Sequence, residues 1–238
     1  MEKKDYIKQR FLQSDITISD NQAEQFVIYY DELIKTNEMV NLTRITDFEE
    51  VVDKHFIDSA YLVKYVDFSR NINVIDIGTG AGFPSVPIKI LYPNINLTLL
   101  DSLNKRLLFL DGLCNKLGLN NVRLLHGRAE DFAKTDEYRE VYDISVSRAV
   151  SNLSVLCEYC IPYVKVGGFF VSYKSGEYEE ELKSSFNSLK ILGGCLDETK
   201  VFNICDDKVQ RSLIIIKKVE KTEKKYPRRA GIPSKKPL

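Results

Sequence analysis

The sequence predicts an α/β fold in which a mostly parallel sheet carries helices on both faces. From Val74 onward, short apolar runs alternate with amphipathic stretches, a pattern typical of strands and helices that follow one another along the chain. The 238 residues, 44% of them hydrophobic, are enough for one domain with a substantial core and an extension. A purely helical pattern precedes the alternation, so we expect the extension to be helical and N-terminal.

Residues 4–66 have apolar side chains at helical spacing, for example Phe26, Tyr29 and Leu33. Ser19-Asp20, followed by Gln22, resembles a signal for the start of a helix, because a serine hydroxyl can accept a hydrogen bond from a backbone amide in the first turn. We interpret residues 1–66 as a helical cap, 67–220 as a Rossmann-like domain and 221–238 as a basic tail.

The expected sheet has seven strands, of which the last two pair as a hairpin across Cys205 to Gln210. Strands are expected near residues 73–77, 96–101, 121–126, 141–147, 168–174, 196–205 and 212–219. Helices are expected near residues 83–91, 104–117, 150–162 and 177–191.

The most informative segment is Asn73–Pro84, an apolar strand that runs into a turn with glycines at positions 78, 80 and 82. Glycine accepts backbone angles that other residues avoid, and its missing Cβ lets a ligand approach the chain closely. The helix that follows directs its amide groups to the same place. Asp101 stands 25 residues after Asp76, at the end of the next strand. This arrangement predicts a nucleoside cofactor.

The spacing also distinguishes between two cofactors. A dinucleotide fingerprint has the form G-x-G-x-x-G, whereas here Asp76 precedes three glycines at alternate positions. An acid in front of the glycines would repel a pyrophosphate but suits an ammonium group, such as the methionine end of S-adenosylmethionine. Asp101 can then accept hydrogen bonds from both ribose hydroxyls. A Rossmann-type dehydrogenase is the competing enzyme class, which the glycine spacing disfavours.

Ligands of such sheets bind beyond the carboxyl ends of the strands. The five segments that follow the first five strands all carry polar or glycine residues: 76–82, 101–102, 127–131, 147–149 and 174–176. Loops are polar in any case, so each segment taken alone has an equally good explanation as solvated surface.

Charge and cysteine content limit the other classes. Formal net charge is zero, yet from Lys217 onward nine basic residues stand against two acidic ones, which suggests a basic arm for nucleic acid or, alternatively, a solvated terminus. No apolar run is long enough for a membrane span or a signal peptide, so we expect a cytoplasmic protein without a membrane partner. The five scattered cysteines, with only two histidines, predict buried small side chains, no disulfide framework and no metal site.

Several motifs together resemble the glucose-inhibited division protein B family, also called RsmG, of 16S rRNA guanine-N7 methyltransferases. The resemblance rests on Asn41-Leu42-Thr43, His55-x-x-Asp58-Ser59, Asp76–Pro84, Leu100-Asp101-Ser102-x-x-Lys105-Arg106, Arg128–Asp131, Ser147–Val150, Lys174 and the ending Tyr226–Leu238. It covers nearly the whole chain. Two departures are Ser85 and Ser175, which stand where the family pattern has glycine.

The resemblance implies a class I S-adenosylmethionine-dependent methyltransferase fold, S-adenosylmethionine as methyl donor, and 16S rRNA of the small ribosomal subunit as partner. The target it implies is the guanine conventionally numbered 527 in the 530 loop. By motif, Gly78 and Phe83 line the methionine end of the pocket, Ala129 and Glu130 the adenine, and Arg148 the floor near the methyl group. The cofactor-binding candidates are Asp76, Gly78, Thr79, Gly80, Gly82, Phe83, Asp101, Ser102, Ala129, Glu130 and Arg148.

On the acceptor side, we expect Arg148, and with it Lys174, to position the RNA. The alternatives are an ion pair for Arg148, a solvated lysine for Lys174 and a helix cap for Glu130. Candidates for contacts with the RNA backbone are Lys105, Arg106, Arg228, Arg229 and Lys235.

Guanine N7 carries no proton, so the reaction needs no general base, and the protein has only to desolvate and align the reactants. Accordingly, we expect Asn41 and His55, with Asp58, to tie the cap over the pocket, and we do not expect His55 to act in catalysis. A methyltransferase with another RNA or protein substrate, and a non-catalytic rRNA-binding assembly factor, are the other functions considered. A monomer is expected.

Overall fold

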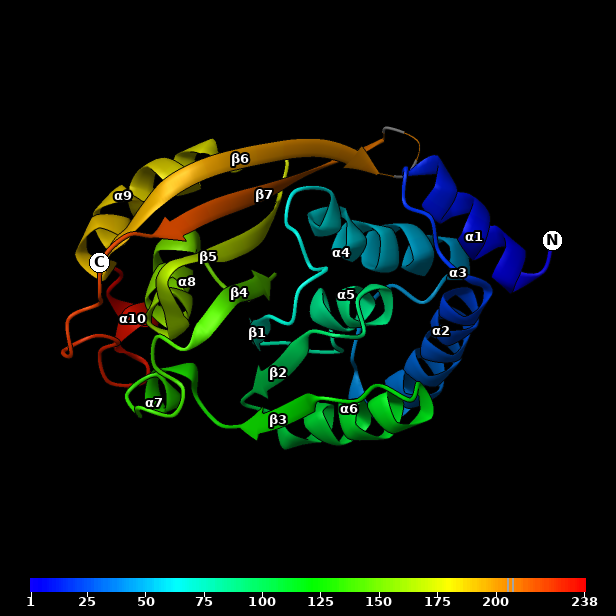
Figure 1. The fold of residues 1–238 in the computed structure, drawn as a ribbon, viewed down its shortest axis with the longest axis horizontal. Coiled ribbons are helices and arrows are strands. Elements are labelled where there is room, and N and C mark those ends of the chain that lie inside the picture. Colours follow the sequence, from blue (N-terminus) through cyan, green and yellow to red (C-terminus); the bar gives the residue numbers. More distant parts are fainter. Residues whose placement is uncertain (205, 207) are drawn as a thin grey trace.

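The computed structural model describes residues 1–204, 206 and 208–238, and in these the predicted α/β architecture is present (Figure 1). The strands form one seven-stranded sheet in the order β3-β2-β1-β4-β5-β7-β6. They are β1 (Asn73–Ile77), β2 (Asn96–Asp101), β3 (Val122–His126), β4 (Tyr142–Arg148), β5 (Val164–Ser175), β6 (Gly194–Ile204) and β7 (Val209–Lys218). The pairings among β1 to β5 are parallel, whereas β7 runs antiparallel to both β5 and β6. The expected terminal hairpin is confirmed, although Cys205 lies outside the described residues.

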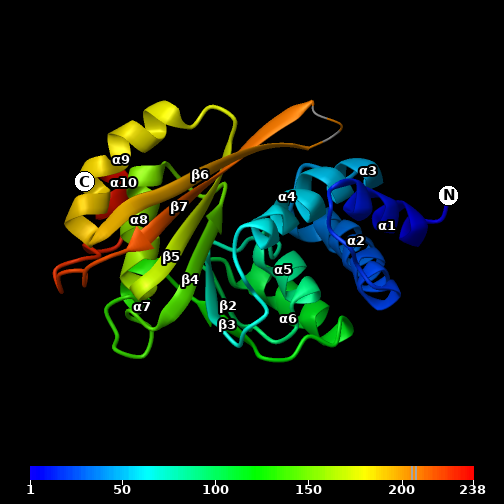
Figure 2. The same cartoon turned by 45° about the horizontal axis from the view of Figure 1, so that its top comes forward.

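Helices cover both faces of the sheet (Figure 2). The α-helices are α1 (Lys3–Gln13), α2 (Asp20–Val40), α3 (Phe48–Val51), α4 (Asp58–Ala60), α5 (Ser85–Leu91), α6 (Asn104–Lys116), α7 (Ala129–Phe132), α8 (Leu153–Cys160), α9 (Glu179–Leu192) and α10 (Ile232–Lys235). A π-helical segment (Val52–Ile57) and 3₁₀ segments (Tyr61–Lys64 and Ile161–Tyr163) complete the helical part. In Figure 2, α8 to α10 lie on one side of the sheet, and α4 to α6 lie on the other together with α1 and α2.

The central strands are buried on both faces, and β7 shows this residue by residue. Leu213 and Ile215 belong to the cluster that includes the N-terminal helices, whereas Ile214 and Ile216 belong to the cluster beneath α8 and α9. Successive side chains of a strand point to opposite faces, so a segment covered on both sides is expected to be apolar at successive positions. This is why the middle of β7, Leu213–Ile216, appears in the sequence as an uninterrupted apolar run.

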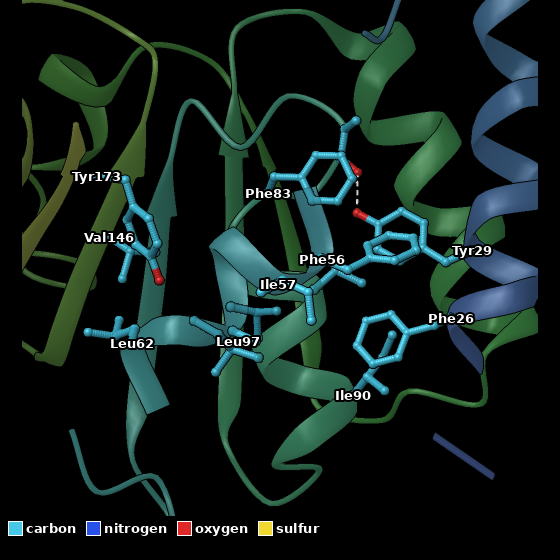
Figure 3. Packing of buried hydrophobic residues seen from close by; sticks show 14 of the residues in the cluster. Phe26, Tyr29, Phe56, Ile57, Leu62, Phe83, Ile90, Leu97, Val146 and Tyr173 are labelled. Carbon is cyan, nitrogen blue, oxygen red and sulfur yellow. Dashed lines mark hydrogen bonds between the residues drawn. The ribbon is translucent and has the colours of Figure 1, made fainter. Parts of the chain in front are cut away.

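The helical cap is anchored to the glycine turn that follows β1. Ser19 caps α2 and exchanges hydrogen bonds with Gln22, as its sequence pattern indicated. Further along α2, the fully buried Tyr29 donates a hydrogen bond of 2.7 Å to the carbonyl of Ala81 and stacks on Phe83 with ring centroids 5.2 Å apart. Figure 3 shows Tyr29, Phe56 and Phe83 packed together from three parts of the chain. The cap therefore shares its core with the turn.

Between Val51 and Val63, where the apolar side chains have helical spacing, the chain passes from α3 through the π-helical segment into α4 and the 3₁₀ segment. One local expectation was wrong. Cys195 is exposed at the start of β6, whereas the buried position expected for all cysteines holds for Cys114, Cys157 and Cys160. Cys195 leaves the core because β6 is the edge strand of the sheet.

The C-terminal segment packs on the domain in the structure. Arg139 donates hydrogen bonds to the carbonyls of Thr222, Glu223 and Tyr226, at 2.7 to 3.2 Å. Tyr226 and Leu238 pack against the apolar cluster beneath α8 and α9. Basic composition alone did not indicate these contacts.

Candidate active site

A cavity of about 880 Å³ lies where the parallel strands end, bounded by the cap on its other side. The sequence-predicted residues that line it are Gly78, Thr79, Gly80, Phe83, Asp101, Ser102, Arg106, Arg148 and Lys174. They come from the segments after β1 and β2 and from the ends of β4 and β5. Parallel strands bring their carboxyl ends to one edge of the sheet, which explains why residues up to a hundred positions apart meet here.

The turn after β1 requires glycine at two positions for different reasons. Gly82 has φ +99°, and a Cβ there would stand 2.7 to 2.8 Å from Val86, Leu110 and the Tyr29 hydroxyl. Gly78 has φ +73°, and its Cβ would stand 2.6 Å from Val150, in the segment after β4. The turn can therefore pack against α5, α6 and the cap while its open side faces the cavity.

Asp101 ends β2 with its carboxylate at the mouth of this turn. One oxygen accepts the Gly80 amide at 2.9 Å and an Arg106 N–H at 3.3 Å, and the other accepts the Leu103 amide at 2.9 Å. The residue is 2% exposed yet lines the cavity. Because a carboxylate offers about four acceptor sites, Asp101 retains capacity for the hydroxyls of a ligand.

Asp76 lies beneath the turn and does not line the cavity. Its Oδ2 accepts hydrogen bonds from the hydroxyls of Thr79 and Ser85, and its Oδ1 has no partner in the described part of the chain. Complete burial raises the pKa of Asp76 to about 7, although the two hydroxyls oppose this shift. Ser85, a departure from the family pattern, thus supplies a donor that glycine lacks.

Arg148 lies between the Phe83 ring and two side chains of the cap, Asp58 and His55. Its guanidinium lies over the Phe83 ring at 4.9 Å, donates to Asp58 Oδ2 at 2.7 Å and contacts His55 Nδ1 at 3.3 Å. The other His55 nitrogen lies 2.8 Å from the Thr43 hydroxyl. Burial, and next the positive charge of Arg148, lower the pKa of His55 to about 3, so the imidazole is neutral at physiological pH. The ion pair considered as an alternative for Arg148 is present.

Lys174, at the end of β5, is also paired. Its ammonium group contacts Glu181 at 2.6 Å and the Ser151 carbonyl at 2.8 Å, and the Glu181 carboxylate also accepts the Leu153 amide at 2.6 Å. The Lys174 side chain is 12% exposed. Lys174 therefore connects the segment after β4 to α9.

The remaining predicted residues lie outside the lining of the cavity. Glu130, at 2% exposure, accepts the backbone amide of Gly231 at 3.0 Å, so the C-terminal segment covers it. Arg228 forms a paired contact at 2.6 to 3.1 Å with Glu158, which is buried. Ala129 is buried in α7, Gly82 is in the turn, and Lys105, Arg229 and Lys235 are exposed.

Sequence reasoning expected the cap over the pocket but did not assign Leu42 and Ile45 of the cap, Tyr173 of β5 or Arg211 of β7 to the site. All four line the cavity. Arg211 stands at the beginning of β7, opposite Ser175 in the antiparallel register, so the first residues of β7 reach the edge where the parallel strands end. A search limited to the carboxyl ends of strands could not find it.

Comparisons with known proteins agree with the family resemblance seen in the sequence. Residues 22–214 match the family described as GidB, rRNA small subunit methyltransferase G. Similar relatives are the ribosomal RNA small subunit methyltransferase G of Lachnoclostridium phytofermentans, 50% identical over 93% of this chain and 91% of that one, and that of Alkaliphilus metalliredigens, 44% identical over the full length of both.

Among solved structures, the precorrin-6y C5,15-methyltransferase of Geobacter metallireducens is similar, with a TM-score of 0.51 and 17% identity over 73% of this chain and 90% of that one. The likeness shows the fold. Within the described residues, no group of three or more His, Cys, Asp or Glu side chains could hold a metal ion. No helix among these residues is both long enough and apolar enough to span a membrane.

Proposed function

The chain belongs to the rRNA small subunit methyltransferase G family, and from this premise we propose how its site carries out the reaction. It has a class I methyltransferase fold and is an S-adenosylmethionine-dependent methyltransferase of 16S rRNA that acts on N7 of a guanine. We propose the guanine at position 527 as the target.

S-adenosylmethionine fits the residues of the glycine turn. A Cβ at Gly80 would meet no atom closer than 4.0 Å, so the turn is open toward the cavity, and Asp101 beside it has acceptor capacity left. In the proposal, Asp101 and Ser102 hold the ribose, and Gly78, Thr79, Gly80 and Phe83 hold the methionine end. Bound there, the cofactor supplies an electrophilic methyl group on a sulfonium.

The remaining cofactor candidates do not line the cavity, and they are proposed to shape the glycine turn or to lie at the adenine end. Asp76 and Gly82 shape the turn, because Asp76 holds Thr79 and Ser85 while Gly82 permits close packing. Ala129 and Glu130 are proposed for the adenine end. Glu130 also receives the Gly231 amide, so the C-terminal segment would support the adenine end of the pocket.

The chemistry of the site suits an acceptor without a proton. His55 uses both ring nitrogens within the protein and is a poor base, since its pKa is lowered to about 3. None of the cysteines in the described residues lines the cavity, which disfavours methylation of cytosine C5 through a thiol nucleophile. A guanine N7 lone pair needs neither group, and alignment can supply roughly 7–11 kcal/mol of the barrier.

For the acceptor side we propose that Arg148 forms the floor near the methyl group and keeps the cap in place, with Lys174 positioning the segment after β4. Lys105, Arg106, Arg229 and Lys235 are proposed to contact RNA phosphates, and Arg228 to fasten the tail that carries them. We further propose the division into a cap (1–66), a methyltransferase domain (67–220) and a tail (221–238), a cytoplasmic location beside the ribosomal substrate, and a monomer.

The observation that carries the proposal is the meeting of the glycine turn, Asp101 and Arg148 around one cavity. It is tested by labelled methyl transfer from S-adenosylmethionine to small ribosomal subunits and to protein-free 16S rRNA, with nucleosides identified after digestion. 7-Methylguanosine in either sample is expected. Cofactor binding without transfer to either would refute the proposed acceptor.

A further inference from the structure

One acceptor atom beside the cavity makes no hydrogen bond, and it belongs to the cap. Asp58 is 3% exposed and lines the cavity. Its Oδ2 holds Arg148, but its Oδ1 makes no hydrogen bond within the described residues. A buried carboxylate oxygen without a hydrogen bond is costly, and such a group at a cavity calls for an explanation.

The other polar groups around Asp58 are already used. Both nitrogens of His55 have partners, and the Tyr173 hydroxyl donates to the Ser59 carbonyl at 2.9 Å. Lys174 is held by Glu181. Asp58 Oδ1 is therefore a buried acceptor of a cavity-lining residue that no hydrogen bond uses within the described residues.

A donor stands directly beside this acceptor. Arg211 Nε lies 3.5 Å from Asp58 Oδ1, and Arg211 also donates through one NH2 group to the Gln210 carbonyl at 3.3 Å. The other NH2 group has no hydrogen bond to a described residue. Contacts link Phe83 to Arg148, Arg148 to Asp58 and Asp58 to Arg211, so the pair is joined through Arg148 to the part of the cavity proposed for the methyl group.

We propose that Asp58 is the residue that selects guanine, by accepting hydrogen bonds from its N1–H and N2–H₂ groups on Oδ1, while Arg211 donates to O6. This inference rests on the proposed function, because it assumes a purine acceptor in the cavity. Guanine presents two donors and one acceptor along this edge, and a carboxylate beside a guanidinium matches that order. N7 lies on the opposite side of the purine from N2 and stays free to face the cofactor.

The same pair rejects adenine. Adenine has an acceptor at N1 and a donor at its 6-amino group, so a carboxylate would face a lone pair and a guanidinium would face an amine. An edge that is paired in a duplex is out of reach, so the base must leave its stack to enter the cavity. Selection would thus take place inside the protein, in addition to any selection by the shape of the RNA.

The test compares guanosine with inosine, which lacks only the 2-amino group, at the target position. 16S rRNA carrying either nucleoside there is made by ligating a synthetic segment, and it is assayed both free and reconstituted into small subunits with the full-length protein. Methylation of the two RNAs by dimethyl sulfate corrects for any difference in N7 reactivity. Wild-type kcat/KM is expected to be about 10- to 100-fold lower for inosine, the effect of losing a hydrogen bond to a charged acceptor.

The variant Asp58→Asn keeps the shape but presents donors to the base, because Arg148 will hold the amide oxygen. Its preference for guanosine over inosine is expected to fall to within about twofold. Asp53→Asn is the matched control. Asp53 is another buried carboxylate of the cap, paired with Arg10 at 2.9 Å, and it does not line the cavity. It should keep the wild-type preference.

Equal rates of the wild-type protein on the two RNAs would overturn the inference, and this comparison needs no variant to fold. So would a slow Asp58→Asn protein that retains the full preference, because Asp58 would then serve only to hold Arg148. If unmodified subunits yield no 7-methylguanosine, the proposed function itself is wrong, and the inference is lost with it.

Discussion

Substituting alanine for Gly82 is expected to destabilise the protein by about 2–5 kcal/mol. Placing an L-residue at a positive φ costs roughly 1–2 kcal/mol, and forcing a methyl group into a filled space costs about 1–3 kcal/mol more. Both terms apply because φ is +99° and the added Cβ would stand 2.7 to 2.8 Å from atoms of α5, α6 and α2. A loss of this size is a large part of the stability of an ordinary domain.

The assay is urea unfolding followed by circular dichroism, with calorimetric titration of S-adenosylmethionine on the folded protein. Affinity should also fall, since the turn must shift to accept the methyl group. Gly112→Ala is the control, because a Cβ there meets no atom within 4 Å and the site is inside helix α6. It should stabilise the protein by roughly 0.5–1 kcal/mol. A loss below about 1 kcal/mol for Gly82→Ala, or equal losses for both variants, would refute the reasoning.

Three further predictions follow from ion pairs and burial. Arg148→Ala should lose most single-turnover methyl transfer, and normal turnover would contradict its role. Because it removes the closer of the two cationic partners of buried Asp58, it should also lose up to about 3–5 kcal/mol of stability. Arg228→Ala should lower the unfolding temperature, because it removes the partner of Glu158, whose side chain is only 1% exposed. Arg229→Ala, at the exposed neighbouring position, should change the salt dependence of rRNA binding and leave stability unchanged. The reverse result would show that the tail contacts are wrongly assigned. The pKa of His55 is about 3 in the folded protein and about 6.5 in the unfolded chain, so between these values the unfolded chain takes up a proton that the folded protein does not. The free energy of unfolding should therefore decrease as the pH falls below about 6.5, by about 3 kcal/mol at pH 4. His55→Gln should flatten this part of the pH profile from urea unfolding, and an unchanged profile would contradict the prediction.

Local sequence patterns were sufficient for most elements of the Rossmann-like domain. The run Leu213–Ile216 indicates a strand because it is apolar at every position, and Ser19 with Gln22 marks a helix start because the capping contacts lie within one turn. Between Val51 and Val63 the apolar spacing is helical, but it did not indicate the π-helical and 3₁₀ segments that the structure has there. The spacing of apolar residues indicates which face of a helical segment is buried, but it does not indicate the shape of the surface that this face packs against.

The sequence by itself determined the strand that leads into the glycine turn, the acid at the end of the next strand, and hence the part of the cavity that we propose for the cofactor. These features depend on neighbours in the chain and on the shared edge of parallel strands. Only the tertiary structure decided the end of the cavity that we propose for the acceptor base. Asp58 and Arg211 are 153 positions apart in the sequence, and they meet because the cap folds over the sheet edge and β7 runs antiparallel to β5. The structure likewise decided that Arg228 is bound to Glu158, because the sequence of a basic tail does not indicate which buried residue one of its charges will pair with. Pairings of this kind depend on how distant surfaces fit together, which no local pattern records.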